Sequence, residues 1–325
     1  MRTSENLKAI GIGCLASVFF SSTYIVNSFL AVSGGHWAWT AGLRSFFLVL
    51  MLGALLQFRK QLRPLLQAMR QHVGVWALWG SVAFGVTYIF MTSAASFGPG
   101  WLGSGAFQFT IVAGILLSPF IYKDHRARIP VRALLLSLLI LTGIALMQWS
   151  QKDGAYTLEQ LLLCVLLMLL AAFLWPLANR KLMLHVEEKG LQLNAIQRVA
   201  GTAIGSIPVQ FVLMGVGYTQ VGLPGQEQLL AVLVITVSAG MIGCILFFKA
   251  MHIARADGAG LAAVEATQAL EILMTVIGEV LLLGIAWPNW MGNVGMFLIM
   301  AGLILYSLPA RQLTWKRSRV QKELA

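Results

Sequence analysis

The chain has few charged residues. Asp, Glu, Lys and Arg make up only 11% of its 325 residues, whereas 58% are hydrophobic. A soluble domain has roughly 25% charged residues, so this composition excludes a water-soluble globular protein and indicates an integral membrane protein. The net charge of +11 does not indicate a nucleic-acid partner, because the basic residues lie in short gaps between apolar runs.

Cysteine is also scarce, and the motifs of metal sites and enzymes are missing. Cys14, Cys164 and Cys244 each lie in a separate apolar run, which excludes a disulfide framework and a thiolate metal site. The five histidines lie near segment ends without an HExxH pair, so no metal or cofactor is expected. No DxD or GxSxG motif is present, which argues against a polytopic membrane enzyme.

Long apolar runs fill the rest of the chain. The first follows Arg2 and Lys8 and continues to about residue 31 without a small-residue cleavage site, so it predicts a spanning helix rather than a signal peptide. A spanning helix needs roughly 20 apolar residues. Ten segments qualify: 9–31, 37–57, 74–97, 101–122, 132–150, 158–180, 193–214, 228–250, 259–283 and 289–309. We therefore predict an all-α integral membrane protein with ten transmembrane helices.

The basic residues gather on one side of the predicted membrane. Twenty of the 23 Lys and Arg residues fall at the two termini or in alternate linkers, and the opposite linkers hold only Lys152. The positive-inside rule then places both termini in the cytoplasm, as in a multi-pass protein of the inner (cytoplasmic) membrane. The other two basic residues, Arg44 and Arg198, lie inside predicted spans.

The two halves of the chain show weak similarity. GLRSFF (42–47) matches IQRVAG (196–201) at an offset of 154 residues, and GPGWLGSGAFQ (98–108) matches GAGLAAVEATQ (258–268) at an offset of 160. Because each half has an odd number of spans, the second enters the membrane from the opposite side. We predict two inverted five-helix repeats, residues 1–151 and residues 152–325, the second with a short basic cytoplasmic tail. Many secondary transporters are built this way and bind substrate near the mid-plane between the repeats.

Several stretches resemble one superfamily of transporters. The chain resembles the drug/metabolite transporter superfamily, with its EamA-like ten-helix members, in four stretches. These are AGLRSFFLVLMLGALL with its intramembrane arginine, AASFGPGWLGSGAF at the start of the fourth span, and QALEILMTVIGEVLLLG and GMFLIMAGLILY near the end. VEATQALE and IGEVLLLG look closest to the multidrug-resistance efflux branch. The resemblance implies a secondary active transporter that exports small organic compounds by alternating access, with protons as the coupling ion.

Two positions depart from the pattern of that branch. The related small multidrug resistance proteins use a glutamate in their first helix as a shared proton and cation site, but SVFFSSTYIVN (17–27) has no acid. Ile285 stands where a glutamate commonly follows the LLLG of the ninth span. Any proton coupling must therefore use other residues.

The ninth span carries three acids, Glu265, Glu271 and Glu279. Carboxylates inside the hydrocarbon core are costly unless they are paired, protonated or hydrated, and so are functional candidates. Glu271, at mid-depth, is the main candidate for proton exchange with a cationic substrate; alternatively, it neutralises Arg44 or donates a hydrogen bond while protonated. Glu265 either pairs with Arg198 or acts in coupling or substrate binding. Glu279 is expected near the outer interface, hydrated or locally paired.

The resemblance places four polar residues around a central cavity: Tyr24, Asn27, Gln108 and Gln268. Each could instead form an interhelical hydrogen bond. Trp175 precedes Pro176, and a proline in a spanning helix frees a carbonyl and tends to kink the helix toward a cavity.

The intramembrane charges favour a cationic partner. Two arginines and three glutamates sum to −1 if all are ionised. Arg44 is expected to be a structural strut that bonds helix-end carbonyls rather than an anion ligand. The sequence thus predicts proton-coupled efflux of cationic or drug-like compounds. Export of an amino acid or other metabolite is the alternative, and a non-transporting membrane protein is a remote one.

Overall fold

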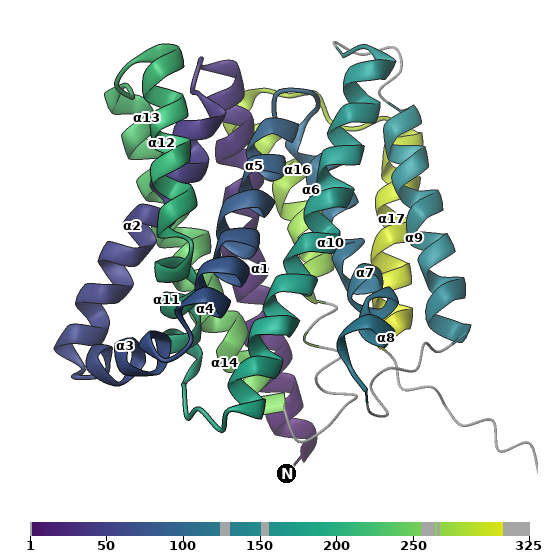
Figure 1. Cartoon of the computed structure of the whole chain (residues 1–325). Coiled ribbons are helices and arrows are strands. Elements are labelled where there is room, and N and C mark those ends of the chain that lie inside the picture. Colours follow the sequence, from purple (N-terminus) through teal and green to yellow (C-terminus); the bar gives the residue numbers. More distant parts are fainter. Residues whose placement is uncertain (1, 124–130, 151–155, 255–263, 265–266, 308–325) are drawn as a thin grey trace, which may run out of the picture.

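The computed structural model describes residues 2–123, 131–150, 156–254, 264 and 267–307. All regular elements in these residues are helical, which confirms the all-α prediction. The long helices run side by side between two opposite faces of the molecule (Figure 1). The boundary predicted between residues 151 and 152, the basic tail and Glu265 lie outside the described residues.

The elements follow one another along the chain in two groups. The first half contains α1 (Arg2–Val32), α2 (Trp37–Phe58), α3 (Leu62–Arg70), α4 (Val73–Gly80), η1 (Ser81–Val86), α5 (Thr87–Ala94), α6 (Gly100–Phe107), α7 (Thr110–Leu116), α8 (Ser118–Ile121) and α9 (Val131–Trp149). The second half contains α10 (Leu158–Glu188), α11 (Ala195–Gly205), α12 (Ile207–Val221), α13 (Gln226–Ile235), η3 (Thr236–Gly243), α14 (Cys244–Ala254), η4 (Thr267–Ala269), α16 (Leu270–Leu283) and α17 (Trp290–Ser307).

Several of these helices are long and apolar enough to cross a bilayer, so the protein is a multi-pass membrane protein. Five described spans qualify: Leu7–Val32, Trp37–Phe58, Val73–Ala94, Leu158–Glu188 and Gln226–Met251. A sixth results if α11 and α12, bent by 50° at their junction, cross together. Three shorter apolar helices are Gly100–Leu116, Leu138–Trp149 and Trp290–Leu305. The predicted ten spans exceed the five or six found in the described residues, and that count stays a prediction.

Two predicted spans are broken by local sequence. The segment 101–122 divides into α6, α7 and α8, with a turn at Gln108 and Phe109. The segment 193–214 bends after Gly205, where Pro208 lies in the first turn of α12. A proline cannot donate the backbone hydrogen bond that would continue the preceding helix, so a break is expected there.

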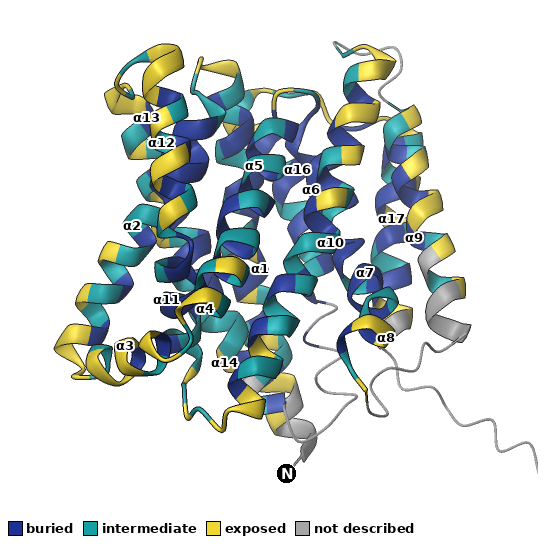
Figure 2. Ribbon diagram, viewed as in Figure 1, coloured by how far each residue is buried: buried dark blue, intermediate teal, exposed yellow. Residues whose placement is uncertain are grey.

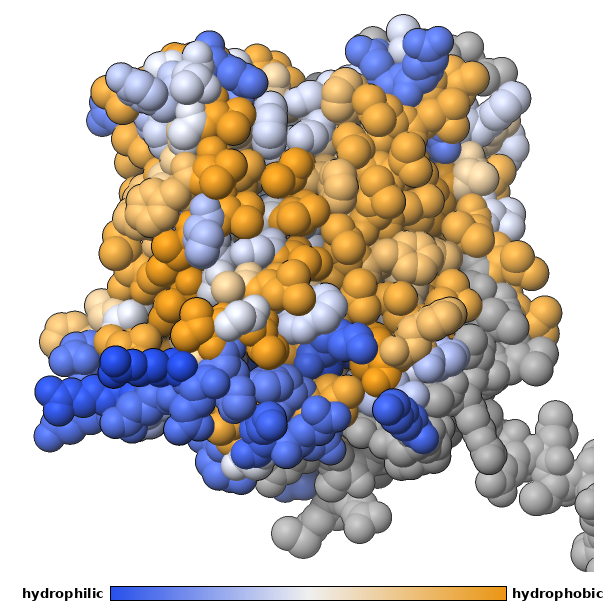
Figure 3. Space-filling view, in the orientation of Figure 1, coloured by the Kyte–Doolittle hydropathy of each residue, from blue (hydrophilic) through white to orange (hydrophobic). Residues whose placement is uncertain are grey.

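The surface separates into an apolar band and hydrophilic ends (Figure 3). The lower end in Figure 3 is the more strongly hydrophilic, where α2 ends and α3 lies across the helix ends. Its exposed cations include Arg59, Lys60, Arg63 and Arg70, and we call this end the basic face. Around the apolar band, side chains such as Phe211 remain exposed, as Figure 2 shows for the outer helix faces. Such a band is the surface that a lipid bilayer covers.

Two π-helical turns occur at related positions in the two halves. η1 lies in the third predicted span and η3 in the eighth, and their first residues, Ser81 and Thr236, are 155 residues apart. This separation falls within the 154 to 160 residue offset of the sequence matches. Such turns are rare and are frequent at functional sites. Their spacing is the one that the predicted repeat would give, and the repeat itself stays a prediction.

Helices α9 and α17 pack along each other at one edge of the bundle (Figure 1). A Cβ atom added to Gly143 would lie 2.7 Å from the carbonyl oxygen of Gly295, and one added to Gly295 would lie 2.6 Å from that of Gly143. The two backbones therefore meet directly, in the way that small residues allow in membranes.

This contact predicts that a larger side chain lowers the stability of the protein at Gly143 but not at a glycine with free space around it. Gly143→Ala should separate α9 from α17 and destabilise the protein by about 1–3 kcal/mol, the usual cost of overpacking. Thermal unfolding in detergent measures it. Gly215→Ala is the control, because nothing lies within 4 Å of a Cβ atom there. Equal melting temperatures for the two variants would contradict the close contact.

Candidate functional site

A cavity of about 220 Å³ lies inside the helix bundle. Its walls come from α1, η1, α10, α11, α14 and η4, which belong to both halves of the chain. Aromatic side chains dominate the lining: Phe20, Phe84, Trp175, Phe247 and Phe248. The polar lining residues are Asn179, Arg198, Thr202 and Gln268. We call this space the central cavity.

The central cavity continues into a wider space of about 1000 Å³. The two share the lining residues Met183, Arg198, Val199, Cys244, Phe247 and Phe248. The wider space is also lined by Arg59, at the end of α2, and by Lys249 of α14. Because Arg59 belongs to the basic face, the central cavity is connected to that face.

Trp175 forms part of the cavity wall, as the sequence predicts. Its ring stacks on Phe84, with 5.7 Å between ring centroids and 26° between planes. The side-chain amide of Asn179 donates to the Trp175 carbonyl oxygen at 2.8 Å. α10 runs from Leu158 to Glu188 as one helix through Pro176, so the proline does not divide the helix. The result is an aromatic wall built from α10 and η1.

Glu271 lies behind the cavity wall and is connected to it through one residue, Gln108. Its side chain is buried on α16 and does not line the cavity. The Gln108 side-chain amide donates to the Glu271 carboxylate in a long bond of 3.5 Å, and to the carbonyl oxygen of Gln268 at 3.2 Å. The structure therefore brings Gln108, Gln268 and Glu271 together.

Arg44 makes a different contact from the one expected. Its guanidinium carbon lies 3.7 Å from the Tyr88 ring centroid and 6.0 Å from that of Phe84. Its Nε and Nη1 are buried without a hydrogen-bond partner in the described part of the chain. No ion pair joins Arg44 to Glu271, both of which the structure describes. Arg44 is thus held against an aromatic face rather than by the helix-end carbonyls that the sequence interpretation assigned to it.

Arg198 borders both cavities. Its side chain is half-buried, with the guanidinium carbon 5.8 Å from the Phe248 ring centroid. Its Nε is buried and has no hydrogen-bond partner among the described residues. The predicted partner, Glu265, lies outside those residues, so an Arg198–Glu265 ion pair stays a prediction.

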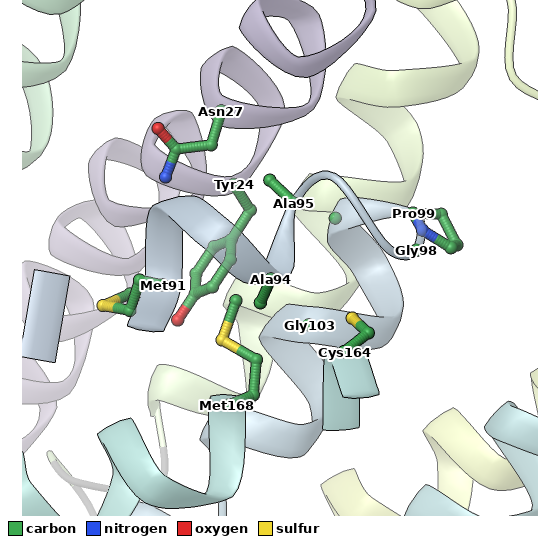
Figure 4. Close-up of a pocket in the computed structure, with 11 residues that line it drawn as sticks. Tyr24, Asn27, Met91, Ala94, Ala95, Gly98, Pro99, Gly103, Cys164 and Met168 are labelled. Carbon is green, nitrogen blue, oxygen red and sulfur yellow. The ribbon is translucent and has the colours of Figure 1, made fainter. Parts of the chain in front are cut away.

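Tyr24 and Asn27 do not line the central cavity, contrary to the expectation from the family resemblance. They line a much smaller pocket of about 10 Å³ (Figure 4), together with Met91, Ala94, Ala95, Gly98, Pro99, Gly100, Gly103, Cys164 and Met168. In Figure 4 the Tyr24 ring extends between Met91 and Ala94. The central cavity does not extend to the depth of these two residues.

Glu279 is fully buried rather than hydrated at an interface. Its Oε1 accepts a hydrogen bond from the Gly100 amide at 2.7 Å, and its Oε2 accepts one from the Trp101 amide at 3.0 Å. These are the first two residues of α6, and Pro99 before them provides no side-chain cap. The carboxylate therefore satisfies backbone donors that the start of a helix leaves free.

The sequence interpretation missed most of the aromatic lining. Phe20, Phe84, Phe247 and Phe248 lie in apolar runs, where an aromatic residue facing a cavity resembles one facing lipid or the core. In the structure, Phe84 lies in one π-helical turn and Cys244 directly follows the other. No sequence motif predicts these turns.

The Arg44 contact predicts that the Tyr88 ring, not its hydroxyl, is needed. Tyr88→Leu should remove the aromatic face and lower stability by on the order of 2 kcal/mol, the value for a desolvated cation–π pair. Tyr88→Phe keeps the ring and should unfold near the wild-type temperature in detergent. If Tyr88→Phe is as unstable as Tyr88→Leu, the cation–π contact is not what holds Arg44.

Comparison with known proteins gives a family and a fold. Residues 7–312 match the family model described as "EmrE: Putative multidrug resistance efflux transporter". The chain is 38% identical over 314 residues to "Uncharacterized protein YjlA" of Bacillus subtilis (strain 168), covering 94% of this chain and 96% of that one. It is 35% identical over 250 residues, 75% of this chain and 65% of the relative, to an "Uncharacterized 42.1 kDa protein in intracellular alkaline protease 3'region" of Shouchella clausii.

A solved structure described only as "Crystal structure of protein" has a TM-score of 0.62 to this chain, over 94% of this chain and 99% of the other. At 17% identity, this likeness shows the fold alone. The family match covers nearly all of the spans and both cavities, and its members are transporters rather than enzymes. The chain belongs to the EmrE family of multidrug resistance efflux transporters, within the drug/metabolite transporter superfamily.

Proposed function

We propose that this protein exports small organic compounds in exchange for protons, by alternating access. One observation carries the proposal: a cavity connected to the basic face ends near a buried carboxylate, Glu271. Gln268 in the cavity wall is joined to Glu271 through the two hydrogen bonds of Gln108. A proton bound at Glu271 and a compound bound in the cavity would therefore share one polar network.

Alternating access is supported by the unequal spaces on the two sides of this network. Toward the basic face lie about 220 Å³ and then about 1000 Å³ of open space, whereas the Tyr24 pocket holds only about 10 Å³. Such an arrangement is that of a transporter open to one side. The inverted repeat proposed from the sequence would allow the reverse arrangement, and the paired π-helical turns support that repeat.

The orientation follows from the charges. The basic face carries Arg59, Lys60, Arg63 and Arg70, and the positive-inside rule assigns such a face to the cytoplasm. In an inner membrane, the central cavity would then be open to the cytoplasm. That is the side from which an exporter takes up its substrate.

The cavity chemistry favours flat, amphipathic compounds, and cations among them. Five aromatic rings offer stacking surfaces, and their faces attract positive charge. The Phe84–Trp175 stack is already in place, so a planar ligand could extend it without reorganising the wall. Glu271, joined to Gln268 through Gln108, would supply a negative charge behind the cavity wall when its carboxyl group is ionised.

Arg198 supports a second candidate, export of an amino acid or another carboxylate-bearing metabolite. A guanidinium can hold a carboxylate through two parallel hydrogen bonds. Arg198→Gln should then weaken binding of carboxylates roughly tenfold or more, as expected for the loss of a charged hydrogen bond. Binding of a cationic dye should be unchanged or stronger. Titration with a dye, an amino acid and an aromatic acid measures this, and weaker binding of the dye alone would exclude the carboxylate candidate.

Glu271→Gln tests the coupling. The change keeps the shape and hydrogen-bonding capacity of the side chain but removes its charge, so proton-driven accumulation in proteoliposomes should be lost while the protein folds. Protons and a cationic substrate compete for one carboxylate, so wild-type binding should strengthen as pH rises. The Gln variant should bind equally across the same pH range.

Glu159→Gln is the matched control, because Glu159 is exposed on the first turn of α10. It should transport like wild type. If Glu271→Gln accumulates substrate uphill with a normal pH dependence, Glu271 is not the coupling residue. Should Glu265→Gln lose coupling instead, the roles of the two acids are reversed.

A further inference from the structure

On the side of the bundle away from the basic face, a strong contact joins α16 to α6. Glu279, near the end of α16, holds the amides of Gly100 and Trp101 at the start of α6 at 2.7 Å and 3.0 Å. These partners are more than 170 residues apart in the chain, and α6 and α16 pack together in the bundle (Figure 1). A buried carboxylate on backbone amides is a strong bond, but it depends on the negative charge of one side chain.

The contact leaves no spare room. A Cβ atom on Gly100 would lie 2.7 Å from Ser28 Oγ, 2.8 Å from Glu279 Oε1 and 3.0 Å from the Tyr24 carbonyl oxygen. The start of α6 is thus pressed between α1 and α16. Movement of α6 away from α16 requires Glu279 to release its amides.

The Tyr24 pocket lies directly beside this contact. Gly100 is one of its lining residues, with Asn27 and Cys164 (Figure 4). Asn27 also lines a second small pocket together with Gly35, Trp37 and the exposed Ser96, at the ends of helices opposite the basic face. The two small pockets, which share Asn27, therefore lie one after the other between the middle of the bundle and that opposite face.

An unpartnered polar atom lies on the same line. Asn27 Oδ1 is buried without a hydrogen-bond partner in the part of the chain that the structure describes. Buried polar groups without partners are costly in an apolar environment. Their cost is removed if water reaches them in another conformation, which is expected of a pathway that is closed in one state and hydrated in the other.

We propose that the Tyr24–Asn27–Cys164 pocket is the collapsed outer half of the substrate pathway, and that Glu279 is the latch that keeps it closed. The proposal rests on the transport function proposed above. When the latch releases, α6 moves away from α1 and α16, and the small pockets widen toward the opposite face. The central cavity should narrow in the same movement, because the pathway opens to one side at a time.

Two native cysteines report on the two halves of the pathway. Cys164 lines the small pocket and Cys244 lines the central cavity. Variants that retain only one of them, with the other cysteines changed to alanine, can be reacted with a small water-soluble methanethiosulfonate. Mass spectrometry then gives the rate at each site. In the otherwise wild-type protein, Cys244 should react quickly and Cys164 slowly.

Glu279→Gln removes the charge that holds α6. It should raise the reaction rate of Cys164 roughly tenfold, as expected for the loss of a charged hydrogen bond, and lower that of Cys244. If the Gln variant does not fold, Glu279→Asp, whose side chain is one methylene shorter, is used in its place. The expected changes in the two reaction rates are the same. Glu159→Gln should change neither rate. The latch is contradicted if Cys164 stays as slow as in wild type, or if both cysteines react faster, since the latter indicates loosened structure rather than a switch.

The labelling needs neither a substrate nor a proton gradient, so it is independent of the coupling experiment. If labelling shifts as described but no compound is transported, the latch stands and the exporter proposal falls. If transport is proton-coupled and Glu279→Gln leaves both rates unchanged, the function stands and the latch falls.

Discussion

The structure depends on how acids are accommodated in a bundle that lipid surrounds. A carboxylate in that setting needs hydrogen-bond donors, and water is scarce. Glu271 and Glu279 both lie on α16, and both find donors in the first half of the chain: a glutamine side chain for one and two backbone amides for the other. The seam between α16 and α6 is therefore held by polar contacts inside an otherwise apolar core, and any motion between the halves must act on them.

The buried cations are accommodated differently. Arg44 and Arg198 lie over aromatic rings, with some of their donors unpaired among the described residues. Aromatic faces hold a cation without fixing it in one hydrogen-bonded geometry. The rings near these arginines, Phe84 and Phe248, also line the central cavity. The same property would make the cavity tolerant of different planar ligands, as the proposed export of small organic compounds requires.

The sequence was sufficient to predict a helical membrane protein and its family. Of the site residues that it singled out, Trp175 and Gln268 line the central cavity and Gln108 contacts Glu271, while their roles in transport stay predictions. Depth along a helix can be counted from the sequence, so Glu271 was placed at the middle of its span. The sequence does not show which other helices pack over a residue at a given depth. Glu279 was therefore expected near the outer interface, hydrated or locally paired, and the structure buries it against the start of α6. Tyr24 and Asn27 were assigned to a cavity that does not extend to them. The aromatic lining carries no sequence signal, because phenylalanine suits lipid, core and cavity equally well.

The central claim is that movement of a compound through the cavity is tied to movement of protons. The most direct measurement uses proteoliposomes with equal pH on both sides and a gradient of a cationic dye as the only driving force. If the proposed exchange occurs, protons flow in the direction opposite to the cationic dye. A pH-sensitive fluorophore on one side of the membrane reports this proton flow, which should stop when the gradient of the cationic dye is abolished. Dye movement through the wild-type protein with no accompanying proton flow would contradict it.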